Sequence, residues 1–300
     1  MRGCFYGLVF AASGTAAMAQ DLEPRAFSNA PVGMQFFLAG FGETRGRVSL
    51  DPALPIDNLG MESTFGLIAW ARTMEVLGQS AKVDVVVPYS TLDAHGLVFG
   101  EPRTRHVSGF ADPAVRFSMN FIGAPALTMK EFASYKQDLI VGGSLRLGIP
   151  VGQYDEDRLI NIGSNRWTLR PELGVSKAWG PWTLELSPGI TFYTDNDDFF
   201  GGQRREQDPI WSMQTHLSHT FSPGCWLALD AAYFDGGRTT VNALPNNDQQ
   251  EGFRFGLTFA VPLSRYQSVK LYALQGYDTT MERDLNAFGL AWQYRWGGGF

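Results

Sequence analysis

The side chains best suited to chemistry alternate with apolar residues at a spacing of two. Arg146 lies between Leu145 and Leu147, and Glu185 follows Leu184. Because successive residues of a β-strand point to opposite faces, this spacing places the charges on one face and the apolar side chains on the other. The pattern recurs along the chain and predicts one inward-facing charged set: Arg116, Arg146, Arg170, Glu172, Glu185, Asp230, Arg254 and Arg295.

This charged set has two interpretations. Opposed charges around a narrow pore would act as a selectivity ring that decides which solutes pass. Paired Arg and carboxylate side chains can instead fill the interior of a small barrel, because each buried charge needs a partner. The two interpretations are compatible, and the sequence leaves both open.

An enzymatic site is suggested by His216 and Ser218. Residues two apart on a strand share a face, so the imidazole could activate the hydroxyl, as in outer-membrane lipid hydrolases. The alternation with Leu217 turns both side chains inward, away from a lipid substrate, and no carboxylate is evident that would orient the histidine. The sequence therefore favours a protein that is not an enzyme.

Two acidic runs lie in stretches expected to be loops, at Asp155, Glu156 and Asp157 and at Asp195, Asp197 and Asp198. Carboxylates of this kind can hold calcium, but their spacing does not match an EF-hand loop, and such runs are usually solvated. Zinc and nucleotide motifs are absent from the sequence. We expect neither a bound metal nor a cofactor.

The charged positions belong to segments of alternating polarity, separated by turn-rich stretches, from about residue 32 onward. Segments of roughly ten residues with this alternation are typical of transmembrane β-barrels. The sequence predicts an all-β, antiparallel up-and-down barrel of about twelve strands. Its expected strands are 32–46, 62–77, 82–94, 114–121, 138–149, 167–176, 182–192, 211–218, 227–233, 253–259, 268–277 and 288–296.

Connector lengths orient the barrel, because short turns lie on the periplasmic side and long loops outside. The short connectors are 78–80, 180–181, 222–224 and 264–267, and the long ones are 47–61, 95–109, 151–166, 194–209 and 235–251. Both termini are therefore expected on the periplasmic side. One long connector, 122–136, falls on that side. It could form a short helix after Pro125 that plugs or caps the mouth, or it could be an ordinary packed loop.

The N-terminus has the features of a secretory leader, with Arg2, an apolar stretch and a cleavage motif that ends at Ala19. We expect a signal peptide over 1–19, a periplasmic segment over 20–31 and the barrel over 32–300. Loss of Arg2 lowers Lys plus Arg from 24 to 23 and moves the net charge from -6 to -7, which gives no basic face for nucleic acid. Cys225 remains as the only thiol, so an intramolecular disulfide is excluded.

The last strand carries aromatic residues at every second position. Trp292, Tyr294 and Trp296 share one face, and the chain ends at Phe300. Aromatic rings suit the interfacial belt of a lipid-facing surface. We expect these four residues to form the signal that the barrel-assembly machinery of a Gram-negative outer membrane recognises, with outer-membrane lipids around the finished barrel.

Three stretches carry a resemblance to a known family: 21–33 (DLEPRAFSNAPVG), the region from 109–112 (GFAD) to 123–127 (GAPAL), and the terminal Gly-Gly-Gly-Phe. In these the chain resembles the family named for the MetA pathway of phenol degradation. The resemblance implies an outer-membrane barrel that moves aromatic compounds, and it supplies no catalytic residues. We therefore expect a passive channel for small hydrophobic or phenol-like solutes, with a structural barrel of sealed lumen as the alternative.

Overall fold

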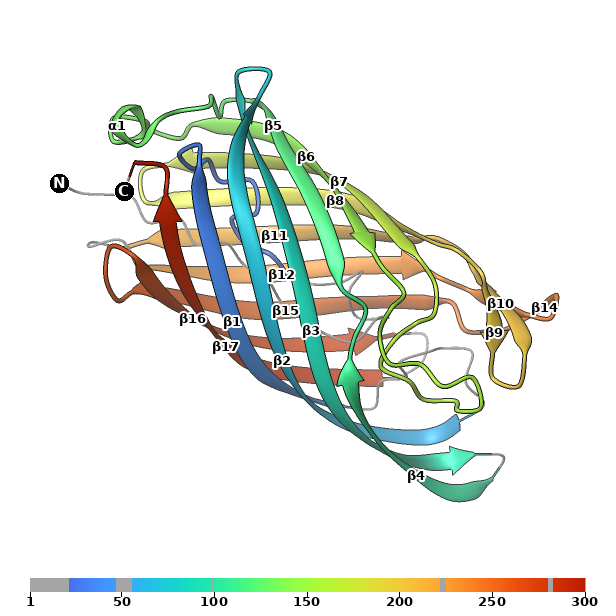
Figure 1. Ribbon diagram of the computed structural model, residues 1–300. Coiled ribbons are helices and arrows are strands. Elements are labelled where there is room, and N and C mark those ends of the chain that lie inside the picture. Colours follow the sequence, from blue (N-terminus) through green and yellow to red (C-terminus); the bar gives the residue numbers. More distant parts are fainter. Residues whose placement is uncertain (1–21, 47–55, 99, 222–224, 280–282, 300) are drawn as a thin grey trace.

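The computed structural model describes residues 22–46, 56–98, 100–221, 225–279 and 283–299. Within these residues, twelve antiparallel strands close into a barrel, which confirms the predicted fold (Figure 1). The ring is closed by pairing of β2 with both β1 and β3. Its strands are β1 (Met34–Gly46), β2 (Ile56–Val76), β3 (Gln79–Val98), β5 (Ala114–Ile122), β6 (Leu139–Gly148), β7 (Thr168–Trp179), β8 (Trp182–Tyr193), β11 (Ile210–Thr220), β12 (Trp226–Gly236), β15 (Gln250–Pro262), β16 (Gln267–Asp278) and β17 (Arg283–Gly297).

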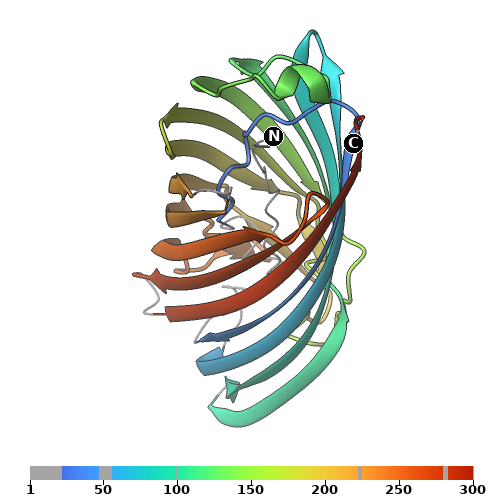
Figure 2. The same ribbon diagram turned by 90° about the vertical axis from the view of Figure 1, so that its left-hand side faces the viewer.

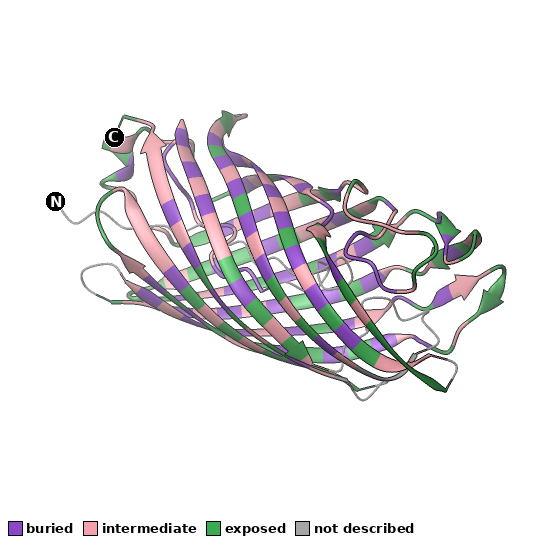
Figure 3. Cartoon of the chain, turned by 60° about the horizontal axis from the view of Figure 1, so that its bottom comes forward, coloured by how far each residue is buried: buried purple, intermediate pink, exposed green. Residues whose placement is uncertain are grey.

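The barrel wall has an apolar outside and a polar or tightly packed inside. Buried and exposed residues alternate along the strands (Figure 3). Large apolar side chains such as Phe255 and Leu173 are exposed on the outer face, whereas Arg254 and Ser176 are buried inside. A slip of one residue would exchange the two faces and place the charges in lipid, so this alternation fixes the register. No helix among the described residues is long and apolar enough to cross a membrane.

The two ends of the barrel differ as the connector lengths predicted. The C-terminus, the β2–β3 turn and the helix α1 (Met129–Phe132) lie at one end, and the long connectors lie at the other (Figure 1). We name these the periplasmic and the extracellular end. The short connector 222–224 and most of 47–61 lie outside the described residues.

The long extracellular connectors contain strands that the sequence did not predict. β3 continues to Val98 and pairs with β4 (Glu101–Phe110), while β9 (Asn196–Phe199), β10 (Gln203–Gln207), β13 (Thr239–Val241) and β14 (Leu244–Pro245) form a separate small sheet. β4 is largely exposed on both faces. Hydrophobic alternation identifies only strands with one buried face, so these hairpins gave no signal.

The connector 122–136 contains a helix, which was one of the two alternatives that the sequence left open, and it is only four residues long. Thr128 caps it, and its backbone N–H and hydroxyl donate to the Glu131 carboxylate, which lowers the pKa of that group. The connector holds the chain start: Leu127 accepts from the backbone N–H of Val32 at 2.9 Å, and Pro125 accepts from the Asn29 side chain at 3.2 Å. It therefore clasps the N-terminal segment where that segment meets the first strand.

The N-terminal segment lies inside the barrel, whereas the sequence predicted a periplasmic segment over 20–31. Of the described part, Leu22, Glu23, Phe27, Asn29 and Ala30 are buried. Figure 2 looks at the periplasmic end and shows the blue segment running within the ring of strands. We name residues 22–31 the plug segment. Its enclosure follows from contacts with lumen side chains that are distant in sequence and gave no local pattern.

The aromatic face of β17 yields a prediction about assembly. Trp292, Tyr294 and Trp296 form a continuous stack, with ring centroids 6.2 Å and 5.8 Å apart, on the outer face of the strand. We expect replacement of Tyr294 and Trp296 by Ala to impair insertion into the membrane more than the stability of barrel already formed. The measurement is the heat-modifiable fraction recovered from membranes, compared with the unfolding midpoint of refolded protein.

The matched control for this prediction replaces Phe288 and Leu290, two exposed residues on the same face of the same strand. Their loss removes comparable apolar surface without touching the terminal stack, so insertion should stay near wild type. Equal insertion of both double variants would show that the terminal aromatics carry no assembly signal. Phe300, the fourth residue of the expected signal, lies outside the described residues.

Candidate functional site: a plugged, two-sided lumen

The plug segment crosses the lumen from one wall to the opposite one. Leu22 packs at Gly256 of β15, where an added Cβ would lie 2.8 Å from the leucine side chain. The neighbouring Glu23 carboxylate instead meets β5 and β6. In the order of pairing, β5 and β15 stand six strands apart in a ring of twelve within the described residues. The segment therefore spans the interior rather than following one side.

Glu23 is the centre of the first charged cluster. Its carboxylate accepts a hydrogen bond from Arg116 and lies 3.7 Å from the Arg146 guanidinium. Arg116 also donates to Asp84 of β3 at 3.1 Å, and Lys82 lies 3.8 Å from the same Asp84. All these side chains are largely enclosed, and each charge lies beside an opposite charge. Burial requires such pairing, because an unpaired charge inside a protein is costly.

A second polar network joins the plug to β8, β11 and β12. The Arg25 backbone N–H donates to Glu185, and that of Glu23 donates to the Gln214 side chain at 3.3 Å. The Arg25 guanidinium lies over the ring of Trp226, with its carbon 5.3 Å from the ring centroid, which is within the range of cation–π attraction. The plug is thus held by backbone and side-chain contacts on two walls.

The remaining predicted inward residues take different roles. Arg170 donates to Glu172 at 2.8 Å, and the Arg254 guanidinium lies 5.8 Å from the centre of the Phe234 ring. Arg295 lies at the periplasmic rim, where its Nε donates to the Arg265 backbone carbonyl at 2.8 Å. These ion pairs support the interpretation in which the charged set fills the barrel interior.

His216 lies in the second network and has the carboxylate partner that the sequence did not reveal. Its Nδ1 lies 2.8 Å from Asp230, which also accepts from Thr258, and its Nε2 lies 3.2 Å from Gln214. Both ring nitrogens are therefore engaged away from Ser218, whose buried hydroxyl has no hydrogen-bond partner among the described residues. The arrangement gives a structural network and no activated serine.

The acidic loop residues make hydrogen bonds and ion pairs at the extracellular end. Asp195 and Asp197 pair with the exposed Arg204 side chain, and Asp155 accepts from the backbone N–H of Asp157 at 3.1 Å. Within the described residues no group of three or more His, Cys, Asp or Glu side chains has the arrangement of a metal site.

Phe27 anchors the plug in a socket formed by two glycines. Gly142 of β6 and Gly174 of β7 both face its ring, and a Cβ added at Gly174 would lie 2.1 Å from it. Phe27 packs there with Ala124 and Ile140 in a small apolar cluster. Only glycine leaves this space free, so the two glycines match the wall to the plug.

We expect Gly174→Ala to loosen the plug, because the added methyl group and the Phe27 ring cannot occupy the same space. The barrel should remain folded, while limited proteolysis should cleave within the plug segment faster than in wild type. Gly180→Ala is not a suitable control, since its φ of +57° strains any other residue, whereas Gly66→Ala meets only an ordinary contact at 3.8 Å. Equal proteolysis of Gly174→Ala, Gly66→Ala and wild type would contradict the socket.

The inner face of β1 and β2 is apolar, and Val86 of β3 extends it, whereas Lys82 and Asp84 of β3 belong to the first charged cluster and the polar network of β8, β11 and β12 lies across the lumen. Its buried inward side chains include Phe36, Leu38, Phe65, Leu67 and Val86, which form one cluster. These residues face a lumen and not a protein core made by a second layer. The lumen is therefore two-sided, with one apolar wall and one charged wall.

The apolar side continues at the extracellular end. Met61 and Leu92 of β2 and β3 pack with Ile160, Ile162 and Phe199 from the long connectors. The connectors therefore fold over the mouth and contact the apolar wall instead of standing free in solvent. The two apolar clusters lie along the same wall, one at the mouth and one that reaches Met34 near the periplasmic end, and the hydrogen-bonded hydroxyls of Ser63 and Ser90 lie between them.

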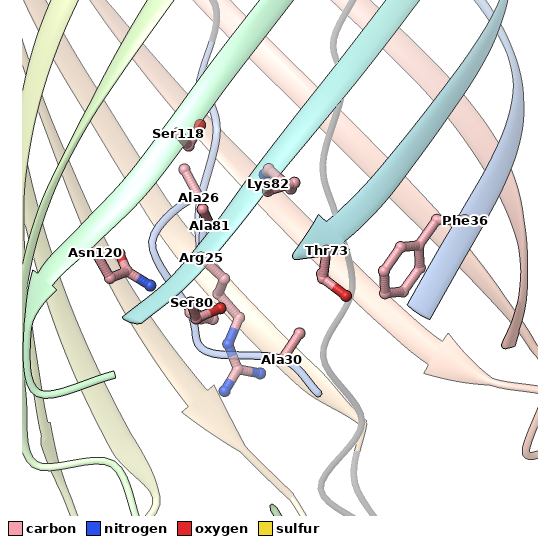
Figure 4. A pocket seen from close by; sticks show the side chains of 11 residues that line it. Arg25, Ala26, Ala30, Phe36, Thr73, Ser80, Ala81, Lys82, Ser118 and Asn120 are labelled. Carbon is pink, nitrogen blue, oxygen red and sulfur yellow. The ribbon is translucent and has the colours of Figure 1, made fainter. Parts of the chain in front are cut away.

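A small cavity remains beside the plug at the periplasmic end. It has a volume of about 30 Å³, enough for a single water molecule, and is lined by Arg25 and Ala30 of the plug, Lys82 of β3 and Asn120 of β5 (Figure 4). Thr73 and Phe36 close the side toward the apolar wall. Plug and wall are thus packed closely, with room for solvent on the charged side.

Sequence reasoning missed the groups that complete these clusters. Glu23 lies outside any strand pattern, and Asp84 and Lys82 lie on a strand whose polarity alternates weakly. Gln214 and Thr258 are uncharged, so nothing in the sequence marked them as partners of His216 and Asp230. The available signal was the mismatch in number between inward arginines and inward carboxylates, which required further acids inside the barrel.

A closed antiparallel barrel with an apolar exterior and a charged, filled interior is a transmembrane β-barrel of the outer-membrane class. Residues 57–294 match the family described as "Putative MetA-pathway of phenol degradation", and the chain belongs to that family. No curated protein matches the chain in sequence.

Two solved structures share this fold. The COG4313 outer membrane channel from Pseudomonas putida F1 is 20% identical, with a TM-score of 0.74, over 92% of this chain and 100% of that chain. The β-domain of the Bordetella autotransporter BrkA is 11% identical, with a TM-score of 0.51, over 88% of this chain and 100% of that chain. At these identities the likeness establishes the barrel fold.

Proposed function

We propose that the protein is a channel of the Gram-negative outer membrane that admits small hydrophobic or aromatic solutes by passive diffusion. The observation that carries this proposal is the two-sided lumen, in which two apolar clusters on the wall of β1 to β3 face the polar network of β8, β11 and β12. A structural barrel needs no such division, whereas a solute with an aromatic ring and a hydroxyl group matches both sides. The family description, which names phenol degradation, supports the same solute class.

The plug segment determines how such a channel would work. It crosses the lumen and, apart from its peptide link to β1, is held there by ion pairs and hydrogen bonds, so it can shift without breaking the wall. A solute that follows the apolar wall meets the plug at its less charged side, near Ala30 and Phe36. We therefore propose that the plug restricts the route and sets its size.

A sealed structural barrel is the second candidate, and the filled lumen favours it. The plug and its partners Arg116, Glu185 and Gln214 occupy the interior from wall to wall. In that case the charged cluster stabilises the barrel and no solute crosses. The two candidates differ in permeability alone, because both predict the same fold.

The side chains on the outer face of the barrel indicate which molecules surround it in the membrane. Exposed residues such as Phe255 and Leu257 suit contact with outer-membrane lipids, and the stack of Trp292, Tyr294 and Trp296 suits recognition by the barrel-assembly machinery. Export by a cleaved leader precedes assembly, although residues 1–21 lie outside the described part of the chain.

The test is conductance and solute entry measured on purified barrel in liposomes, over a panel of phenols, sugars and organic acids. The channel proposal predicts entry of phenols that exceeds that of sugars of similar size. Phenol itself crosses phospholipid, so the vesicles should carry lipopolysaccharide in the outer leaflet, and protein-free vesicles give the baseline. Entry of every solute at the baseline rate would favour the sealed barrel.

A further inference from the structure

His216 and Gln214 of β11 link the barrel wall to the backbone of the plug segment. The Glu23 backbone N–H donates to Gln214 Oε1 at 3.3 Å, and His216 Nε2 lies 3.2 Å from the same oxygen. A backbone N–H can only donate, so the atom that it meets must be the amide oxygen and not the amide nitrogen. Because an amide oxygen only accepts, His216 Nε2 must carry a proton.

The other ring nitrogen of His216 faces a carboxyl group. Nδ1 lies 2.8 Å from Asp230 Oδ1, and Asp230 Oδ2 accepts from the Thr258 hydroxyl at 2.7 Å. A second proton is needed between Nδ1 and Oδ1, since two lone pairs at this distance repel each other. The pair therefore holds one proton more than a neutral imidazole beside an ionised carboxylate.

Carboxyl groups flank His216 on both sides. Asp230 of β12 and Glu185 of β8 are its register partners on the two neighbouring strands, and all three side chains are buried. This arrangement compensates a positive imidazole inside the barrel, so the extra proton belongs on the ring. The other charged groups that interact electrostatically with these three side chains are Glu172 of β7, Lys270 of β16 and Arg25 of the plug.

Loss of the extra proton would change the hydrogen bond that holds the plug. The imidazole would keep one proton, which is favoured on Nδ1 because the hydrogen bond to the ionised Asp230 is charge-assisted. Nε2 would then present a lone pair to Gln214 Oε1. The Gln214 amide relieves this contact by turning its NH2 group toward His216, which places a donor against the Glu23 backbone N–H.

We propose that the His216 and Asp230 pair is a proton-binding site that holds the plug in place, and that the plug loosens when the proton leaves for alkaline water. Gln214 transmits the change because one oxygen serves both partners. The ion pair of Glu23 with Arg116 is untouched, so the plug loosens without leaving the barrel. The proposal rests on the proposed function in one respect, namely that the plug restricts the route.

The first test locates the proton independently of transport. Barrel labelled with 15N in its histidine rings is followed by NMR in detergent micelles from about pH 5 to about pH 9, and His216→Gln assigns the signals. We expect both His216 nitrogens to be protonated at the acid end and one at the alkaline end. The pH of this change should coincide with the pH at which the plug loosens, and two separate midpoints would overturn the proposal.

The second test measures the plug by hydrogen exchange of residues 22–31, corrected for the intrinsic effect of pH on exchange. Protection in wild type should fall about ten-fold toward alkaline pH, as expected for loss of one buried hydrogen bond. Asp230→Asn supplies an amide that donates to Nδ1, so a neutral ring keeps its proton on Nε2 and the plug should stay protected throughout. Gln214→Leu removes the acceptor, and the plug should be loose at every pH.

The matched control is His219→Gln, which removes a second titratable ring from the same strand. His219 packs between the rings of Trp182 and Phe221, and its loss should leave the pH response of the plug as in wild type. Heat modifiability shows that each variant is folded. A wild-type response in Asp230→Asn, or a response abolished by His219→Gln, overturns the proposal. A plug that loosens with pH while single-channel conductance stays constant refutes the restricting role of the plug instead, and leaves the proton site standing.

Discussion

Deletion of residues 22–31 should raise the conductance of the reconstituted barrel several-fold. The plug segment crosses the lumen from β5 to β15 and engages side chains on both charged networks. Its removal leaves a ring of twelve strands in the described chain with an interior that water can enter. Because each partner that the plug leaves, such as Arg116, becomes hydrated, the loss of contacts need not unfold the barrel. The measurement is single-channel current in a planar bilayer.

The control for this deletion is Ser28→Ala, which alters the plug without removing a hydrogen bond, since the Ser28 hydroxyl has no hydrogen-bond partner among the described residues. Its conductance should equal that of wild type. A deletion variant that is heat-modifiable and yet conducts no better than wild type would show that something other than the plug closes the lumen.

Replacement of Arg116 by Ala should give the largest loss of stability of any single substitution in the lumen. Arg116 is the shared partner of Glu23 and Asp84, all three being less than a tenth exposed. Breaking such a buried pair leaves uncompensated charge and typically costs about 3 to 5 kcal/mol. The urea midpoint of detergent-folded barrel measures this loss, and conductance on the same sample should rise because Glu23 loses its main anchor.

Arg204→Ala serves as the matched control for this second prediction. Arg204 pairs with Asp195 and Glu206 on the extracellular surface, where water screens the charges, so its loss should leave the midpoint almost unchanged. A fall in midpoint of equal size in both variants would mean that the lumen pairs contribute no more than surface pairs.

The barrel was predictable from the sequence because its wall obeys a local rule. Leu145 and Leu147 must face lipid, and Arg146 between them must face the interior, so strand position and register follow from neighbouring residues. The twelve strands were obtained in this way, and the connector lengths gave the orientation of the ends. The same rule gave the inward placement of Arg170, Glu172, Glu185 and Asp230.

The filling of the lumen was not predictable, since it depends on contacts between residues far apart in sequence. Glu23 and Arg116 are separated by 93 positions, and nothing near Glu23 indicates that it is enclosed. The apolar inner wall was missed because Phe36, Leu38 and their neighbours alternate with further apolar residues, such as Phe37, that face lipid. Where both faces of a strand are apolar, alternation cannot identify the lumen side.

The central claim is that small aromatic solutes cross this barrel, and it is tested most directly by the ratio of phenol to glucose entry into vesicles. The vesicles carry lipopolysaccharide in their outer leaflet and hold either wild-type barrel or no protein. A two-sided lumen with an apolar wall predicts that the barrel increases phenol entry much more than glucose entry. Entry rates for both solutes equal to those of protein-free vesicles would contradict it and leave a sealed structural barrel.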